Sequence, residues 1–256
     1  MRHDRRLICF ALFAALAMTG KAIAAELRVL STHALEKVVE DVTPEFERAT
    51  GHKLSFSYDP ANAIKRQIEN GAQFDVVLIT RGAIDDLTKQ GNILPDSRVN
   101  LARSGLGVAV RKGLPKPDIS TVEGFKTALL LAKSLVRSTE GTSGIYFEKL
   151  LGQLGIAEQM KGKLKLGPSG RVAELAARGE VDMAVQQISE LIPVTGVELV
   201  GPFPAEVQLY TVFAGAVSTT SRQAEAGKAL IAALTGAHAA LVIREAGLEP
   251  VTGERN

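Results

Sequence analysis

Leu27–Gly51 reads LRVLSTHALEKVVEDVTPEFERATG and holds one complete strand–turn–helix unit. Leu27–Ser31 predicts a strand, because apolar residues dominate it. Ala34–Thr50 predicts an amphipathic helix that ends at Gly51. Its apolar stripe consists of Leu35, Val38, Val39, Val42 and Phe46. The polar turn between the two elements therefore lies where a strand leads into a helix.

The same unit recurs along the chain, which is typical of an α/β protein with mainly parallel strands. Further predicted strands are Lys53–Tyr58, Asp75–Thr80, Leu106–Arg111, Ser134–Ser138, Asp182–Gln186 and Val207–Val217. Further predicted helices are Asn62–Asn70, Ala83–Gln90, Val122–Ala132, Ser143–Leu154, Arg171–Arg178, Ser221–Leu234 and Ala237–Glu245. The segment GLPKP, Gly113–Pro117, breaks the pattern as a linker would. We expect one lobe from residues 25–108 and 208–256, and a second from 109–207.

Residues 1–24 have the pattern of a cleavable secretory signal peptide. Arginines precede the apolar run Leu7–Met18, and small residues end at Ala24. The run is shorter than the roughly 20 residues that span a bilayer. We therefore expect a periplasmic product, with the export route, general or twin-arginine, left open. The single cysteine, Cys9, lies in this leader, so we expect no disulfide and no thiol nucleophile.

Composition excludes several classes of function. The formal net charge of the whole chain is +2, and residues 1–24 contribute +3 of it, so the remainder carries −1. Without a basic surface or tryptophan, nothing indicates nucleic-acid binding. The four histidines are scattered, and the motifs of serine hydrolases, zinc proteases and P-loop proteins are absent. We therefore expect no metal and no cofactor.

Four strand–helix turns are rich in hydroxyls and small residues, and ligands of open α/β sheets bind at such turns. They are Ser31–Ala34, Asp59–Asn62, Ser138–Gly144 and Pro168–Arg171. Helix N-termini present unpaired N–H groups and the positive end of the helix dipole, so their convergence predicts an anion site. The alternative is that Ser31, Asn62, Ser143 and Ser169 are ordinary N-caps.

Several stretches resemble, in order and spacing, the periplasmic molybdate-binding protein family. They are LRVLSTHALEKVVEDVTPEFERATG, RQIENGAQFDVVLIT, SGLGVAV, GTSGIYFEKLLGQLG and GRVAELAARGEVDMAV. The resemblance covers nearly all of the chain after the leader. It implies the type II periplasmic binding-protein fold, in which two α/β lobes joined by crossing strands close on an anion.

The presumed binding positions depart from that family's pattern. The second loop lacks the family's serines, and Gln186 replaces an expected tyrosine. Arginines stand at the turns instead, and they bind planar carboxylates through two-pronged contacts. These residues favour an organic polycarboxylate, such as citrate or aconitate, over molybdate. The predicted ligand-binding residues are Ser31, Thr32, His33, Asn62, Thr80, Arg81, Thr142, Ser143, Gly144, Arg171 and Gln186.

Two functions fit one such cleft. The first is the binding component of an ABC importer, with a small anionic ligand and an inner-membrane permease as partners. The second is an enzyme similar to aconitate isomerase, which interconverts cis- and trans-aconitate by proton transfer. For the enzyme, His33 is the predicted proton carrier because imidazole titrates near pH 6.5. Lys65 and Glu140 are alternatives that would need burial to serve. We expect a monomer in either case.

Overall fold

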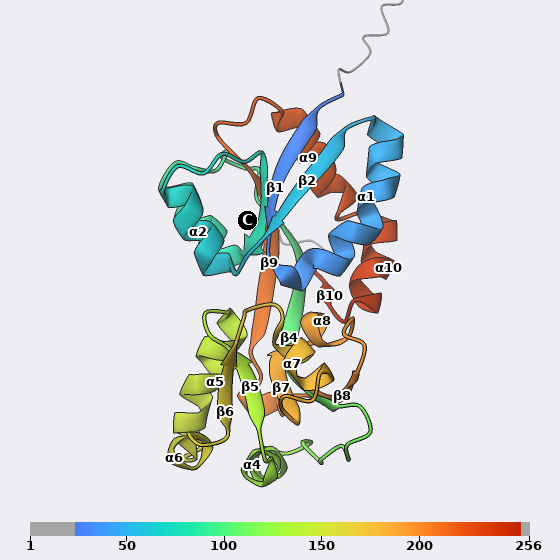
Figure 1. Ribbon diagram of the computed structural model, residues 1–256. Coiled ribbons are helices and arrows are strands. Elements are labelled where there is room, and N and C mark those ends of the chain that lie inside the picture. Colours follow the sequence, from blue (N-terminus) through green and yellow to red (C-terminus); the bar gives the residue numbers. More distant parts are fainter. Residues whose placement is uncertain (1–23, 252–256) are drawn as a thin grey trace, which may run out of the picture.

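The computed structural model describes residues 24–251, so the predicted signal peptide lies outside the described residues apart from Ala24. The chain forms two α/β lobes, one above the other in Figure 1. The ten strands join in one sheet, whose main path runs β2-β1-β3-β9-β4-β7-β5-β6.

The upper lobe in Figure 1 contains both ends of the described chain. Its strands are β1 (Glu26–Ser31), β2 (Lys53–Tyr58), β3 (Val76–Thr80) and the short β10 (Glu249–Pro250). Its helices are the 3-10 turn η1 (His33–Leu35), α1 (Glu36–Thr50), α2 (Ala61–Glu69), α3 (Arg81–Lys89), α9 (Ala224–Ala233) and α10 (Ala237–Glu245). Strands β1, β2 and β3 run parallel. Their carboxyl ends therefore meet at one edge of the sheet.

The lower lobe is formed by the middle of the chain. Its strands are β5 (Leu135–Ser138), β6 (Leu164–Gly167), β7 (Met183–Gln187) and β8 (Val197–Pro202). Its helices are α4 (Val122–Leu131), α5 (Thr142–Gln153), α6 (Ala157–Met160), α7 (Val172–Ala177), α8 (Ile188–Leu191) and the 3-10 turn η2 (Ala205–Val207). Strand β5 is parallel to both β6 and β7.

Two long strands link the lobes. β4 (Val99–Arg111) pairs with β9 (Tyr210–Val217) as far as Gly105, and from Leu106 onward it pairs with β7. At this point the side-chain amide of Gln208 both donates to the carbonyl of Leu106 and accepts from its N–H, at 3.0 and 2.8 Å. These bonds continue the strand pairing where the strand passes from one lobe to the other.

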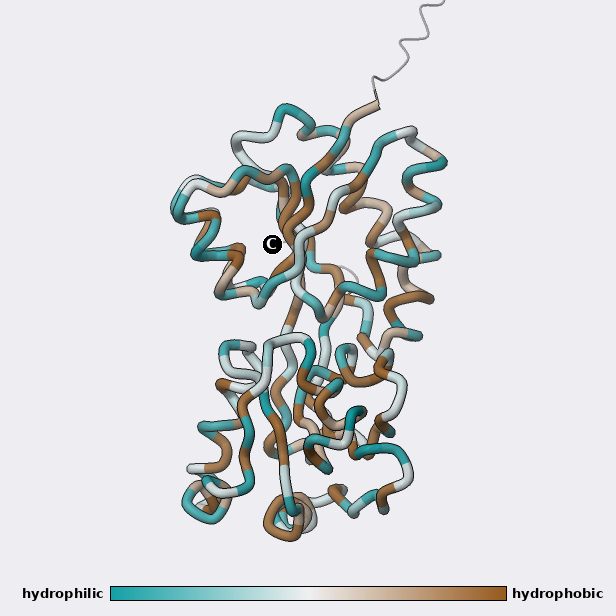
Figure 2. The backbone as a smooth tube through the Cα atoms, in the orientation of Figure 1, coloured by the Kyte–Doolittle hydropathy of each residue, from teal (hydrophilic) through white to brown (hydrophobic). Residues whose placement is uncertain are grey.

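Each lobe has its own core on both faces of its part of the sheet. In the upper lobe, α1, α9 and α10 bury apolar side chains against one face, and α2 and α3 cover the other. In the lower lobe, α4, α5 and α6 pack on one face and α7 and α8 on the other. The strands accordingly carry much of the hydrophobic colour in Figure 2.

The structure extends the sequence-based assignment in several places. β4 begins at Val99 and not at Leu106, because its first half pairs with β9. β9 begins at Tyr210, since Ala205–Val207 turn into a 3-10 helix. Strands β6 and β8 were not predicted; β6 has only four residues, two of them exposed, and neither has a buried apolar run.

Among the described residues, no single helix is long and apolar enough to cross a membrane. Helices α9 and α10 reach that length and composition only as a pair, bent by 61° at the break between them.

Candidate functional site

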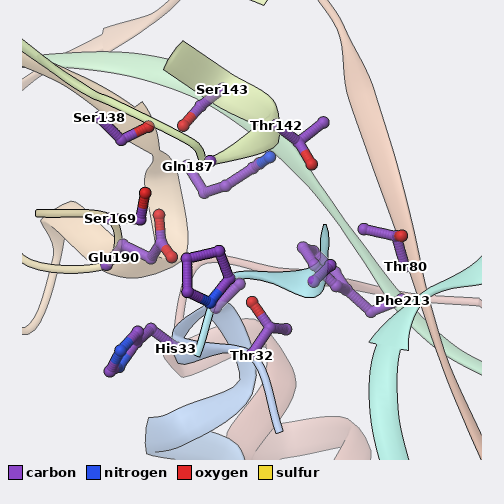
Figure 3. Close-up of a pocket in the computed structure, with 15 residues that line it drawn as sticks. Thr32, His33, Thr80, Ser138, Thr142, Ser143, Ser169, Gln187, Glu190 and Phe213 are labelled. Atoms are coloured by element: carbon purple, nitrogen blue, oxygen red, sulfur yellow. The ribbon is translucent and has the colours of Figure 1, made fainter. Parts of the chain in front are cut away.

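A small cavity of about 30 Å³ lies where the two lobes meet, and we call it the inner cavity. Six hydroxyl side chains line it, two from the upper lobe and four from the lower lobe (Figure 3). They are Thr32, Thr80, Ser138, Thr142, Ser143 and Ser169. The remaining wall includes Pro60, Ala61, Gln187, Glu190 and Phe213. The site is therefore a polar pocket with donors from both lobes.

Three helices of at least two turns begin at the inner cavity. They are α2, α3 and α5, whose N-cap residues are Pro60, Thr80 and Gly141. None of the three N-caps uses its side chain to cap its own helix. The first N–H groups of these helices are thus not consumed by side-chain caps, which suits an anion.

Buried polar atoms without partners point to the same place. Ser138 is 1% exposed and its Oγ has no hydrogen-bond partner. Gln187 donates from Nε2 to Thr211 at 2.9 Å, but its Oε1 has no partner. Leaving such groups unpaired costs about 1–3 kcal/mol each. A ligand carboxylate that accepted a hydrogen bond from the Ser138 hydroxyl would recover that cost at Ser138, whereas the acceptor oxygen of Gln187 needs a donor such as a protonated carboxyl group.

Glu190 places an ionisable carboxyl group on the same wall. It follows β7 in the short helix α8, and in Figure 3 its carboxyl group points toward the hydroxyl of Ser169. Burial raises the pKa of Glu190 to about 7, and the carboxylate of Glu36 adds to the rise. The polar groups of Gln186 and Gln187 act in the opposite direction. Near neutral pH this carboxyl group can therefore both release and accept a proton.

His33 is held on three sides. Its Nδ1 lies 2.9 Å from Oε2 of Glu36, and its ring stacks on Tyr58 with centroids 5.7 Å apart. Across the lobe boundary the ring lies so close to Gly170 that a Cβ atom there would collide with it. In Figure 3 the imidazole is turned away from the hydroxyl groups toward the edge of the view. Burial of Tyr58 and the nearby Glu36 raise the pKa of that phenol.

A second hollow, of about 380 Å³, adjoins the inner cavity, and we call it the outer groove. It shares His33, Gly170 and Glu190 with the inner cavity. Its other charged residues are Glu36, Lys37, Glu40, Arg171 and Glu174. Because carboxylates outnumber cations, the groove is a poor site for an anion.

Two ion pairs join the lobes outside the inner cavity, and we call them the rim pairs. Arg171 contacts Glu36 at 3.0 Å, and Arg66 contacts Glu140 at 2.9 Å. Together with the contact of Gly170 on His33, they hold the lobes closed. A cavity of about 30 Å³ has room for one or two waters only. The lobes must therefore part to admit a polycarboxylate.

The structure brings some of the predicted ligand-binding residues together and not others. Five of them line the inner cavity: Thr32, His33, Thr80, Thr142 and Ser143. The side chain of Ser31 is fully buried and bonds to the carbonyl of Thr32. Gly144 packs so closely on the carbonyl of Ser138 that a Cβ atom would collide with it. Asn62 is exposed in the first turn of α2.

The predicted basic residues lie outside the inner cavity. Arg81 is the half-buried first residue of α3 and is not part of the cavity wall. Arg171 lines the outer groove and is engaged by Glu36. Lys65 is paired with Glu69 at 2.6 Å, and this hydrogen bond raises the pKa of Lys65. Gln186 is fully buried and does not line the inner cavity, whereas its neighbour Gln187 forms part of the cavity wall.

Sequence reasoning missed Glu190 and did not include Ser138 or Ser169 among the ligand-binding residues. Ser138 and Ser169 lie in turns that the sequence did single out. Glu190 had one signal, its position just after the predicted strand Asp182–Gln186, where ligands of α/β sheets bind. Among residues 24–251, no group of three His, Cys, Asp or Glu side chains is arranged to hold a metal ion.

The sequence matches known proteins over nearly its whole length. The sequence pattern of the bacterial extracellular solute-binding proteins matches residues 27–249. Aconitate isomerase of a Pseudomonas species is 35% identical over 259 residues, covering 97% of this chain and 98% of that protein. The molybdate-binding protein ModA of Azotobacter vinelandii is 28% identical over 176 residues, covering 66% of this chain and 68% of that protein.

The fold matches solved structures as well. The periplasmic molybdate-binding protein of Azotobacter vinelandii superimposes with a TM-score of 0.75 at 21% identity, covering 89% of this chain and 100% of that chain. At this identity the likeness concerns the fold alone. It confirms the predicted two-lobe type II periplasmic binding-protein fold, and the sequence matches confirm the predicted resemblance to molybdate-binding proteins.

Proposed function

The chain belongs to the bacterial extracellular solute-binding protein family, and on that premise we propose that its inner cavity binds and isomerises an organic polycarboxylate, as an aconitate isomerase does. Support comes from the 35% identity with aconitate isomerase, which extends over both proteins almost completely. The substrate class is a tricarboxylate with one carbon–carbon double bond.

One observation carries this proposal: an ionisable carboxyl group lies in a cavity otherwise lined by anion-binding groups. Glu190 shares the inner cavity with six hydroxyls and the starts of three helices. An ionised carboxylate repels a bound anion, whether molybdate or a tricarboxylate, so it gives no advantage to a site that only captures anions. The same group is useful when the bound anion must lose and regain a proton. The cavity thus favours proton-transfer chemistry over simple capture of an inorganic anion.

The second candidate function is transport binding. The family, the hinge-like crossing strands and the cross-lobe closure support a periplasmic binding component that delivers a polycarboxylate to an ABC permease. In this case Glu190 would act as a hydrogen-bond donor to a ligand carboxylate while protonated. The two candidates share the ligand class and differ in whether the ligand leaves chemically changed.

Proton NMR of trans-aconitate with a catalytic amount of the protein lacking residues 1–24 separates them. We expect cis-aconitate signals to grow with time and to be absent with heat-inactivated protein. Line broadening without new signals would contradict the isomerase and support transport binding. If neither occurs and molybdate alone binds tightly in a parallel titration, the polycarboxylate proposal is wrong.

A further inference from the structure

We propose that Glu190 is the catalytic residue that carries the proton and that His33 is a positioning residue. This inference rests on the proposed isomerase function and goes beyond it by assigning the chemistry to one side chain. It also replaces the sequence-based hypothesis that His33 or Lys65 carries the proton. These groups differ in whether they line the inner cavity and in the contacts that already engage them.

The reaction balances with a single carboxylate. Ionised Glu190 takes a proton from the methylene carbon of aconitate, and the electron pair of that C–H bond forms a new double bond to the central carbon. The former double bond supplies its electron pair to its CH carbon, on the other side of the central carbon, and this CH carbon receives the proton back from Glu190. The double bond has then moved, and the product forms in the cis or trans geometry. Nothing is oxidised, reduced or consumed.

Glu190 has the position that this step requires. It lines both the inner cavity and the outer groove, so its carboxyl group lies on the wall between the two. Ser138 and Gln187 beside it on the cavity wall have unpartnered polar atoms. The Ser138 hydroxyl can donate to a substrate carboxylate without competing for the proton, whereas the unpartnered atom of Gln187 is an acceptor oxygen. The base and the anchors therefore come from different side chains.

His33 has a different set of contacts. Nδ1 is engaged by Glu36 at 2.9 Å, and the ring is fixed between Tyr58 and Gly170. Glu36 in turn contacts Arg171 of the other lobe at 3.0 Å. His33 thus belongs to a chain of contacts that crosses the lobe boundary. Its effect on the reaction is to fix the closed geometry in which the substrate meets Glu190.

The two remaining candidates are paired outside the inner cavity. Lys65 contacts Glu69 at 2.6 Å and Asp86 at 3.9 Å. Glu140 contacts Arg66, and both side chains are more than half exposed. Neither residue lines the inner cavity. A proton carrier must come within hydrogen-bond reach of its carbon, so these residues do not qualify.

The charged surroundings of Glu190 set the expected pH dependence. From α1 and η1 it is faced by Glu36 and His33, and from the loop before α7 by Arg171. Lys37, Glu40 and Glu174 lie farther out in the same groove. Burial raises the pKa of Glu190 to about 7. Because the base must be ionised to start the reaction, kcat/KM should rise with pH up to about 7 and then level off.

The test compares Glu190→Gln with three further variants. Glu190→Gln keeps the shape of the side chain and should lower kcat at least about 100-fold, the lower end of the range for one acid–base group. Binding of trans-aconitate, measured by calorimetry, should stay within a few-fold of wild type. Glu190→Asp should recover part of kcat. Glu40→Gln makes the same chemical change in the outer groove and should leave kcat unchanged. His33→Asn should raise KM more than it lowers kcat and should keep the pH profile.

Each outcome decides between the assignments. Near-normal kcat in Glu190→Gln, with His33→Asn inactive but still binding, would overturn the inference and leave the isomerase intact. A wild-type protein that binds aconitate without converting it would refute the isomerase function itself. Loss of both binding and thermal stability in Glu190→Gln would be resolved by Glu190→Asp, whose pH profile must shift if Glu190 is the base. An unshifted profile in an active Glu190→Asp protein would also overturn the inference.

Discussion

The inner cavity and the rim pairs occupy the same lobe boundary but are built from opposite kinds of side chain. The inner cavity has neutral hydroxyls, helix starts and the single carboxyl group of Glu190. The rim has full charges that are already paired, Arg66 with Glu140 and Arg171 with Glu36. The difference teaches that charge in this protein closes the lobes, whereas neutral donors receive the ligand.

This division has a physical reason. An exposed ion pair contributes only about 0–1 kcal/mol, which is enough to bias closure and small enough to allow opening. Inside the cavity, an unpaired arginine would be costly to bury, while a hydroxyl or an N–H group costs less and can still bond to an anion. The arginines therefore lie where water can reach them.

The largest expected effect on ligand binding comes from a substitution that keeps the two lobes from closing fully. Gly170 has φ +81° and lies against His33 of the other lobe, so Gly170→Ala should prevent full closure. Overpacking of about 2–3 kcal/mol would weaken polycarboxylate binding about 30- to 150-fold. Calorimetry of the variant checks this value.

Gly179→Ala is the matched control. Gly179 has φ +79° in the same lobe, but its added Cβ would meet only Arg111 at 3.5 Å. Both variants should lose about 1 kcal/mol of stability to left-handed backbone strain. Only Gly170→Ala should lose affinity, and equal losses in both would contradict the closure that we describe.

The next largest effect distinguishes a serine on the wall of the inner cavity from a serine that lines the outer groove. Ser138 and Ser189 are both buried serines without a partner for Oγ, but only Ser138 lines the inner cavity. Ser138→Ala should weaken polycarboxylate binding about 10-fold, since a hydrogen bond to a charged group contributes about 1.5–3 kcal/mol. Ser189→Ala should leave affinity unchanged. Thermal unfolding should show no loss of stability in either, because each removes an unsatisfied polar group.

A further prediction concerns the pH dependence of stability. The carboxyl group of Glu190 has an ordinary pKa of 4.5 when unfolded and a pKa of about 7 when folded. Between these values the folded protein holds a proton that the unfolded chain has released. The free energy of unfolding should therefore fall as pH rises from about 4.5 to 7, by at most about 1.4 kcal/mol per pH unit from this group. Urea unfolding should show a shallower fall for Glu190→Gln, and identical slopes would refute this assignment.

The smallest effect should come from the rim. Arg66 and Glu140 are 58% and 55% exposed, so replacing either with Gln should change ligand affinity less than about 5-fold. The double variant should be no worse than the single ones, and 0.5 M salt should abolish the difference. A loss above 10-fold that persists in high salt would mean that Arg66 binds the ligand directly.

Sequence alone predicted the fold better than the site. The strand–helix alternation and the stops at Gly51, Gly71 and Gly91 follow local rules, and the structure has left-handed glycines at all three positions. Thr32, Thr80 and Thr142, which the sequence assigned to the ligand site, line the inner cavity.

The failures at the site came from pairings between residues distant in the sequence. Arg171 looks free in the sequence, but Glu36 lies 135 residues away in the chain and 3.0 Å away in space. The choice between Gln186 and Gln187 depends on which face of β7 meets the cavity, and a one-residue error reverses it. Burial raises the pKa of Glu190, and this burial depends on the tertiary structure and cannot be predicted from the neighbouring residues in the sequence.

The most direct test of the account is a crystal structure with tricarballylate, the saturated analogue of aconitate that cannot be isomerised. We predict that the lobes close around the ligand and that its carboxylates bind to Ser138 and to the N-termini of α2, α3 and α5. A methylene carbon of the ligand should lie about 3–3.5 Å from a carboxyl oxygen of Glu190. A ligand bound instead through Arg171 and Lys37 in the outer groove, with the inner cavity unchanged, would contradict it.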